Sequence, residues 1–110
     1  MTASSAAYLI DWKLGGIWLG INATGYSDSD KLMILADSLD GLNEIIEKGV
    51  DNDESVLIAA ETAVQSASLC RLALNAKKDY LKRDLLADAS ALYKTAKRIL
   101  NRHTAESSAQ

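Results

Sequence analysis

The sequence contains no proline and no phenylalanine, and aromatic residues make up only 5% of the chain. Strands are enriched in aromatic and β-branched residues, whereas alanine and straight-chain residues lose little side-chain entropy in a helix. The absence of proline also removes the residue that interrupts helices most strongly. Because alanine and leucine dominate instead, the composition favours an all-α fold over one built on a sheet.

Cysteine is almost absent as well, since Cys70 is the only one. A lone cysteine forms no internal disulfide, which fits a reducing compartment. The first residues lack the basic start of a secretory signal, and no run reaches the ~20 apolar residues that span a bilayer. We therefore expect a cytoplasmic protein with no membrane partner. Its small size suggests a bacterial or phage-like setting.

The net charge of −3 hides a strong segregation along the chain. Residues 1–70 carry three lysines against eleven acidic residues, whereas residues 71–110 carry nine basic residues against four acidic ones. Such asymmetry is informative about surfaces and partners rather than about the fold.

Apolar residues recur at steps of three and four in four segments, which predicts helices over about 6–22, 29–48, 52–76 and 79–103. We expect a single domain over 1–110, an up-down four-helix bundle with a disordered tail at 104–110. The third segment has few charges and should be the buried central helix, opened by a capping box of Asp51 and Glu54. Neither Gly nor Pro marks its end, so one continuous helix through residue 103 remains an alternative.

The first segment is apolar on two sides, more than one small bundle can cover. Trp and Tyr are common interface anchors, so we predict a homodimer or partner interface here; the core of a monomer is the alternative. The predicted interface residues are Tyr8, Trp12, Leu14, Ile17 and Trp18. Gly15, Gly16 and Gly20 either break this helix or permit a close backbone approach.

The second and last helices carry opposite charges on their polar sides. An acidic stripe on the second helix is formed by Asp37, Asp40, Glu44 and Glu47. A basic side on the last helix is formed by Arg83, Lys94, Lys97, Arg98 and Arg102. The basic side either contacts nucleic acid or an acidic partner, or pairs with the acidic stripe within the chain or between protomers.

Motifs for chemistry are few, and the sequence predicts neither a metal nor a cofactor. The stretch from Arg98 to His103 resembles the R-x(4–6)-H motif of HEPN ribonucleases, small helical bundles that often dimerise. The resemblance covers six residues and implies that Arg98 and His103 act together on an RNA phosphodiester. Ile99 departs from the family pattern, which has a polar residue after the arginine.

These observations favour a non-enzymatic protein–protein interaction module of the adaptor, chaperone or inhibitor type. The alternatives are a nucleic-acid-binding accessory protein that uses the last helix and a HEPN-like ribonuclease.

Overall fold

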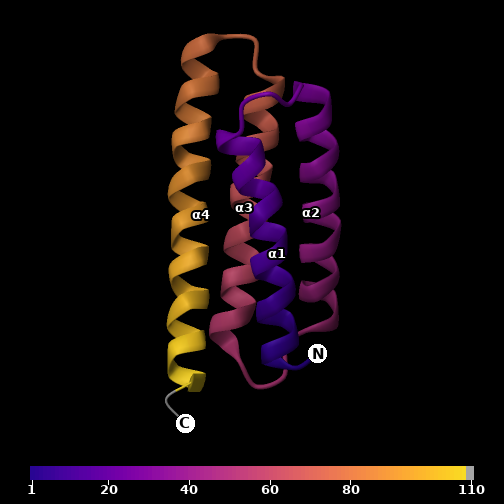
Figure 1. Cartoon of the computed structure of the whole chain (residues 1–110), viewed down its shortest axis with the longest axis vertical. Helices are drawn as coiled ribbons and strands as arrows, with labels where there is room; N and C mark the ends of the chain where they lie inside the picture. The colour runs from indigo at the N-terminus through magenta and orange to yellow at the C-terminus, as the bar shows by residue number, and fades with distance from the viewer. Residues whose placement is uncertain (109–110) are drawn as a thin grey trace.

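The computed structural model describes residues 1–108 and folds them into four helices (Figure 1). The helices are α1 (Ala3–Asn22), α2 (Asp28–Lys48), α3 (Glu54–Asn75) and α4 (Asp79–Ser108). Successive helices run in opposite directions, and short loops join them at alternating ends of the bundle. The predicted all-α four-helix fold is confirmed. Helices α3 and α4 are separate, so the alternative of one continuous helix is wrong.

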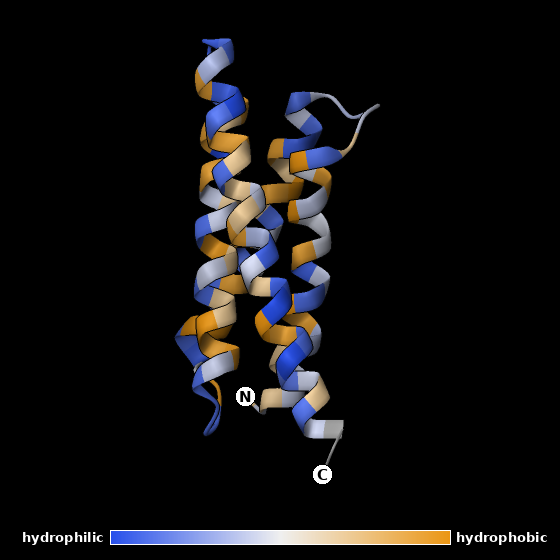
Figure 2. Ribbon diagram, turned by 90° about the vertical axis from the view of Figure 1, so that its left-hand side faces the viewer, coloured by the Kyte–Doolittle hydropathy of each residue, from blue (hydrophilic) through white to orange (hydrophobic). Residues whose placement is uncertain are grey.

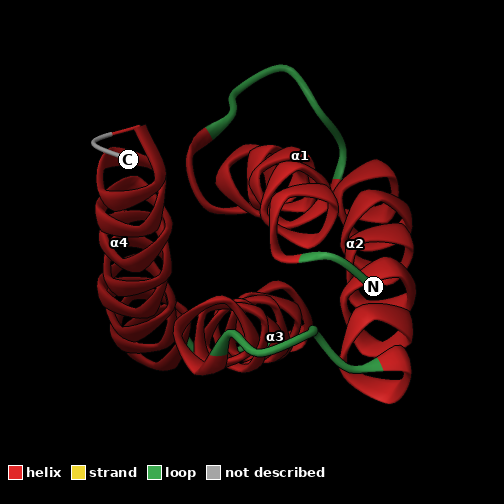
Figure 3. Ribbon diagram, turned by 90° about the horizontal axis from the view of Figure 1, so that it is seen from below, coloured by secondary structure: helices red, strands yellow, loops and turns green. Residues whose placement is uncertain are grey.

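Viewed along the bundle, α1 and α3 lie in the middle, while α2 and α4 lie on opposite sides of them (Figure 3). Over the described residues, every pair of helices is in contact except α2 and α4. The acidic stripe of α2 therefore does not neutralise the basic side of α4 within the chain, and that alternative is excluded for the monomer.

The core is built around α3, which packs against all three other helices. Most of its buried residues are small, so α4 can approach closely. The buried residues of α3 are Val56, Ala59, Ala60, Ala63, Ser66, Ala67, Cys70 and Ala73. This helix is long and apolar enough to cross a membrane by length and composition alone. The apolar composition of α3 is accounted for by its central position, where it packs against α1, α2 and α4.

Helices α2 and α4 are amphipathic, and hydrophobic and hydrophilic positions alternate along their ribbons (Figure 2). Where α1 meets α2 and α3, glycines permit the close approach. A Cβ on Gly16 would lie 2.5 Å from Ser38 Oγ, and one on Gly20 would lie 3.1 Å from Cys70 Sγ. The glycines of α1 therefore allow close packing rather than a break, since the helix is continuous.

Three helix ends differ from the prediction by two residues or more. Helix α1 begins at Ala3 instead of residue 6, because the Thr2 side chain caps it by accepting the Ser5 N–H at 3.2 Å. Helix α3 begins at Glu54 with Asp53 as its N-cap, because the Asp53 carboxylate accepts the Val56 N–H at 3.1 Å; the predicted capping role of Asp51 is wrong. Helix α4 continues through Ser108, so the prediction of a disordered tail is wrong for 104–108. Neither Gly nor Pro follows His103 to end the helix. Residues 109–110 lie outside the described part of the chain.

Candidate functional site

Helix α1 presents one apolar side to solvent. The side chains of Tyr8 and Trp12 are 70% and 67% exposed, and Gly15 and Leu19 continue the same line at helical spacing. These four residues are called the α1 face below. Trp18 is 46% exposed. It lies two helical turns after Asp11, and Asp11 pairs with Lys97 of α4. Trp18 is therefore at the edge of the α1 face that borders α4.

Two of the predicted interface residues are not on this surface. Leu14 and Ile17 are both 0% exposed and belong to the core of the chain. The prediction that they form an exposed interface is wrong, because α1 turns this second apolar side inward against the other helices. The side with Tyr8 and Trp12 is left uncovered.

Shallow grooves flank the α1 face on both sides. Between α1 and α2 an open groove of about 360 Å³ is lined by Trp12, Gly15, Leu19 and neighbouring residues. Between α1 and α4 another of about 750 Å³ includes Tyr8 and Lys97. The exposed aromatic side chains therefore stand on a ridge with space on each side for the side chains of a partner.

The basic side of α4 is open to solvent along most of its length. Arg83, Lys94, Arg98 and Arg102 are exposed, and none of them has a carboxylate within ion-pair distance among the described residues. Lys97 differs from them, because it forms an ion pair with Asp11 of α1. The charge of Lys97 is thus paired with a carboxylate of its own chain, whereas the charges of the other four residues are available to a partner.

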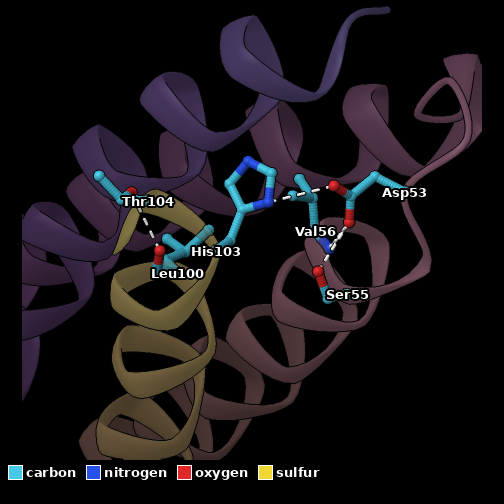
Figure 4. Close-up of polar contacts among 6 residues, drawn as sticks. All are labelled: Asp53, Ser55, Val56, Leu100, His103 and Thr104. Carbon is cyan, nitrogen blue, oxygen red and sulfur yellow. Dashed lines mark hydrogen bonds and ion pairs between the residues drawn. The ribbon is translucent and has the colours of Figure 1, made fainter. Parts of the chain in front are cut away.

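A polar cluster joins the end of α4 to the start of α3 (Figure 4). His103 Nδ1 lies 3.1 Å from Asp53 Oδ2, and the two side chains are only 11% and 21% exposed. The other carboxylate oxygen of Asp53 accepts the Ser55 hydroxyl at 2.7 Å and the Val56 N–H. Asp53 therefore caps α3 and holds α4 at the same time.

The same contacts set the charge state of the carboxylate. The pKa of Asp53 is lowered from its ordinary value of 3.8, first by the hydrogen bond from the Ser55 hydroxyl. Partial burial opposes this effect, while the Val56 N–H and the charge of His103 lower the pKa further. When His103 is neutral, its Nδ1–H donates to Asp53, and Nε2 is left as an acceptor.

The residues that resemble the HEPN motif border one pocket. Arg98, Arg102 and His103 line a surface pocket of about 290 Å³, together with Ser55 and Ile58 of α3. The Arg98 guanidinium donates to the Thr95 hydroxyl at 3.3 Å, while His103 is held by Asp53. Two guanidinium groups beside an imidazole are suited to an anion, although Glu106 adds a negative charge to the same pocket.

Sequence reasoning missed the pairing of His103 with Asp53, and it missed the contribution of Ser55 and Ile58 to this pocket. Fifty residues separate Asp53 from His103. No local spacing signals such a contact, which exists because α3 and α4 run antiparallel. A polar N-cap position just before α3 was the only available hint.

Comparisons with protein-family models, with curated proteins and with solved structures found no match. The four antiparallel helices place the chain in the class of small up-down four-helix bundles. A fold does not define a function, so the function is argued from the surfaces of the bundle.

Proposed function

We propose that this chain is a non-enzymatic protein–protein interaction module, of the adaptor, chaperone or inhibitor type, that binds a partner through the α1 face. The observation that carries the proposal is the exposure of Tyr8 and Trp12 on one side of α1. Burying large aromatic side chains is a main source of affinity at protein interfaces. A surface that leaves two of them in water is stabilised when a partner covers it.

A bacterial or phage-like cytoplasm is the proposed setting of this module. The lone Cys70 supports it, because the thiol is buried in the core and free. A free cysteine without a disulfide partner is typical of reducing compartments.

Site-specific photo-crosslinking tests the proposed binding surface. A photoreactive phenylalanine analogue placed at Tyr8 should form discrete covalent adducts in an extract of the source cells. The matched control carries the same group at Gln65, an exposed residue of α3, which lies opposite α1 in the bundle. Adducts from Tyr8 that disappear in Trp12→Ser protein support the proposal. Equal labelling from both positions, or none from Tyr8, refutes it.

A nucleic-acid-binding accessory function is a second candidate, favoured by the four exposed basic residues of α4 that have no carboxylate partner within residues 1–108. Phosphate contacts make binding steeply dependent on salt. If this function holds, Arg98→Ala/Arg102→Ala protein binds DNA or RNA more weakly, and its salt slope is smaller by roughly one for each phosphate-binding side chain removed. Unchanged binding and an unchanged slope exclude the candidate.

The ribonuclease alternative shares these residues and is tested in the same preparations. It requires that His103→Ala protein stay folded and lose RNA cleavage. Cleavage that persists in a folded His103→Ala protein excludes it.

A further inference from the structure

We infer that the partner covering the α1 face is a second copy of this chain, related to the first by a twofold axis parallel to the helices. The inference rests on the proposed function, because it names the occupant of that surface. It is carried by the charges on either side of the α1 face, and by Gly15 at its centre.

The α1 face lies between flanks of opposite charge. On α2, Asp37 contacts Lys13 of α1 at 3.0 Å, which places the acidic stripe beside α1. Glu44 follows at helical spacing; its pKa is lowered chiefly by Lys48, with a smaller contribution from Lys13. On α4, Lys97 pairs with Asp11 of α1. Residues on the same side of α4 as Lys97 include Arg83 and Lys94.

The two flanks also lie at the same height along the bundle. Asp11 and Lys13 are two residues apart on α1, which is about 3 Å along its axis. Their partners Lys97 and Asp37 are therefore nearly level. Because α2 and α4 run in the same direction, Lys94, about one turn before Lys97, also lies near the height of Asp37. Arg83 lies fourteen residues before Lys97, about 21 Å along the axis, and is therefore beyond the acidic stripe.

The twofold axis decides which flanks meet when two α1 faces pack together. An axis parallel to the helices exchanges the two sides of the face, so the acidic α2 of each copy lies opposite the basic α4 of the other. An axis across the helices places α2 opposite α2 and α4 opposite α4, with like charges facing. Complementary potentials fix the orientation of an interface and favour encounter. The charges therefore select the parallel arrangement.

Gly15 has no packing role within the described chain. A Cβ added there would meet no heavy atom within 4 Å, unlike one on Gly16 or Gly20. A glycine within a helix costs about 1 kcal/mol relative to alanine. In the parallel dimer Gly15 faces Gly15 of the second copy, where the missing side chain lets the two α1 helices approach closely.

Light scattering and sedimentation over a range of concentrations test the dimer itself. The wild type should form particles of twice 11.8 kDa. The variant Gly15→Gln should raise the dimer Kd by more than roughly tenfold while helix content is retained and the monomer is at least as stable as the wild-type monomer, since Gly15 stands in open space. Ala36→Gln, on an exposed position of α2, is the matched control and should dimerise like the wild type. A wild type that stays monomeric, or forms larger open assemblies, overturns the inference.

Neutralising the basic flank tests the orientation. Lys94→Gln protein should dimerise roughly threefold more weakly and with less salt dependence, because each copy loses a charge that faces the partner's acidic stripe. An axis across the helices gives the opposite sign, since neutralisation then relieves repulsion and strengthens the dimer. A stronger or unchanged dimer overturns the parallel arrangement.

The proposed partner binding through the α1 face and the proposed homodimer can be refuted independently of each other. A monomeric protein that still forms heterologous adducts from Tyr8 retains the proposed function and loses the dimer.

Discussion

The hydroxyl of Ser66 in α3 donates a hydrogen bond of 2.7 Å to the carbonyl oxygen of Ala89 in α4, inside the core. Both residues are 0% exposed. The bond shows how closely the two helices approach, because a serine side chain spans the whole distance between them. The Ser66 side chain therefore reaches the backbone carbonyl of α4 with no other side chain in between.

Substitutions at Ser66 should reveal how tightly this contact is packed. Ser66→Ala removes one hydrogen bond and is expected to lower the free energy of unfolding by about 1 kcal/mol. Ser66→Leu places extra volume against α4 and should cost at least ~1–3 kcal/mol. Urea denaturation measures both. A leucine variant as stable as the alanine variant would show that the helices separate easily.

The neighbouring glycines of α1 offer a matched pair. Gly15→Ala should raise monomer stability by about 0.5–1 kcal/mol, since it improves helix propensity in open space. Gly16→Ala should instead destabilise by ~1–2 kcal/mol, because its Cβ would meet Ser38 Oγ at 2.5 Å and Ile34 at 3.2 Å. Thermal unfolding of dilute protein compares them. Equal changes in unfolding temperature for the two variants would contradict the finding that Gly15 faces open space while Gly16 packs against α2.

The acid range should expose the role of Asp53. Its pKa is lowered in the folded chain by the Ser55 hydroxyl and its other partners. Its stabilising contribution is therefore complete above the unfolded pKa of about 3.9 and is lost as pH falls through the lower folded pKa. Asp53→Asn keeps a good N-cap but removes the titration. The stability difference between wild type and variant should shrink as pH falls below about 4.

The control for this prediction is Asp84→Asn, on an exposed residue of α4. Among the described residues Asp84 makes none of the capping or ion-pair contacts that Asp53 makes, so the pH-dependent change for Asp53→Asn should exceed that for Asp84→Asn. A difference for Asp53→Asn that does not change between neutral and strongly acidic pH would mean that the carboxylate contributes no charge-dependent stability.

The thiol of Cys70 should be inert in the folded protein. Burial raises its pKa to about 11, although the charge of Lys31 slightly opposes the shift. Only the thiolate attacks a disulfide reagent, and the side chain is 0% exposed. A chromogenic thiol reagent should therefore react at the rate of unfolding and become fast in denaturant. Fast stoichiometric reaction without denaturant would place Cys70 at the surface.

Much of the fold could be predicted because its signals are local. The spacing of Leu35, Leu39 and Leu42 predicts an amphipathic α2, and all three are buried. The small, nearly uncharged residues between 56 and 73 predict a central helix. The absence of proline and the polar residues before each helix account for most of the boundaries.

The candidate site was less predictable. Tyr8, Trp12 and Trp18 were identified from their residue types, whereas Leu14 and Ile17 were assigned to the surface and lie in the core. Helix α1 is apolar on two sides, and its own sequence carries no signal for which side faces inward. That choice depends on where α2, α3 and α4 lie around it.

The amino-acid sequence alone determined four helices, an all-α class and a strong separation of charge, because propensity, periodicity and capping act within a few residues of one another. Only the tertiary structure decided that α2 and α4 lie apart, that Asp53 meets His103, and that Tyr8 and Trp12 remain in solvent. Those outcomes depend on which apolar sides of the helices are buried, because the core has room for only some of them. The packing of all four helices together determines that choice.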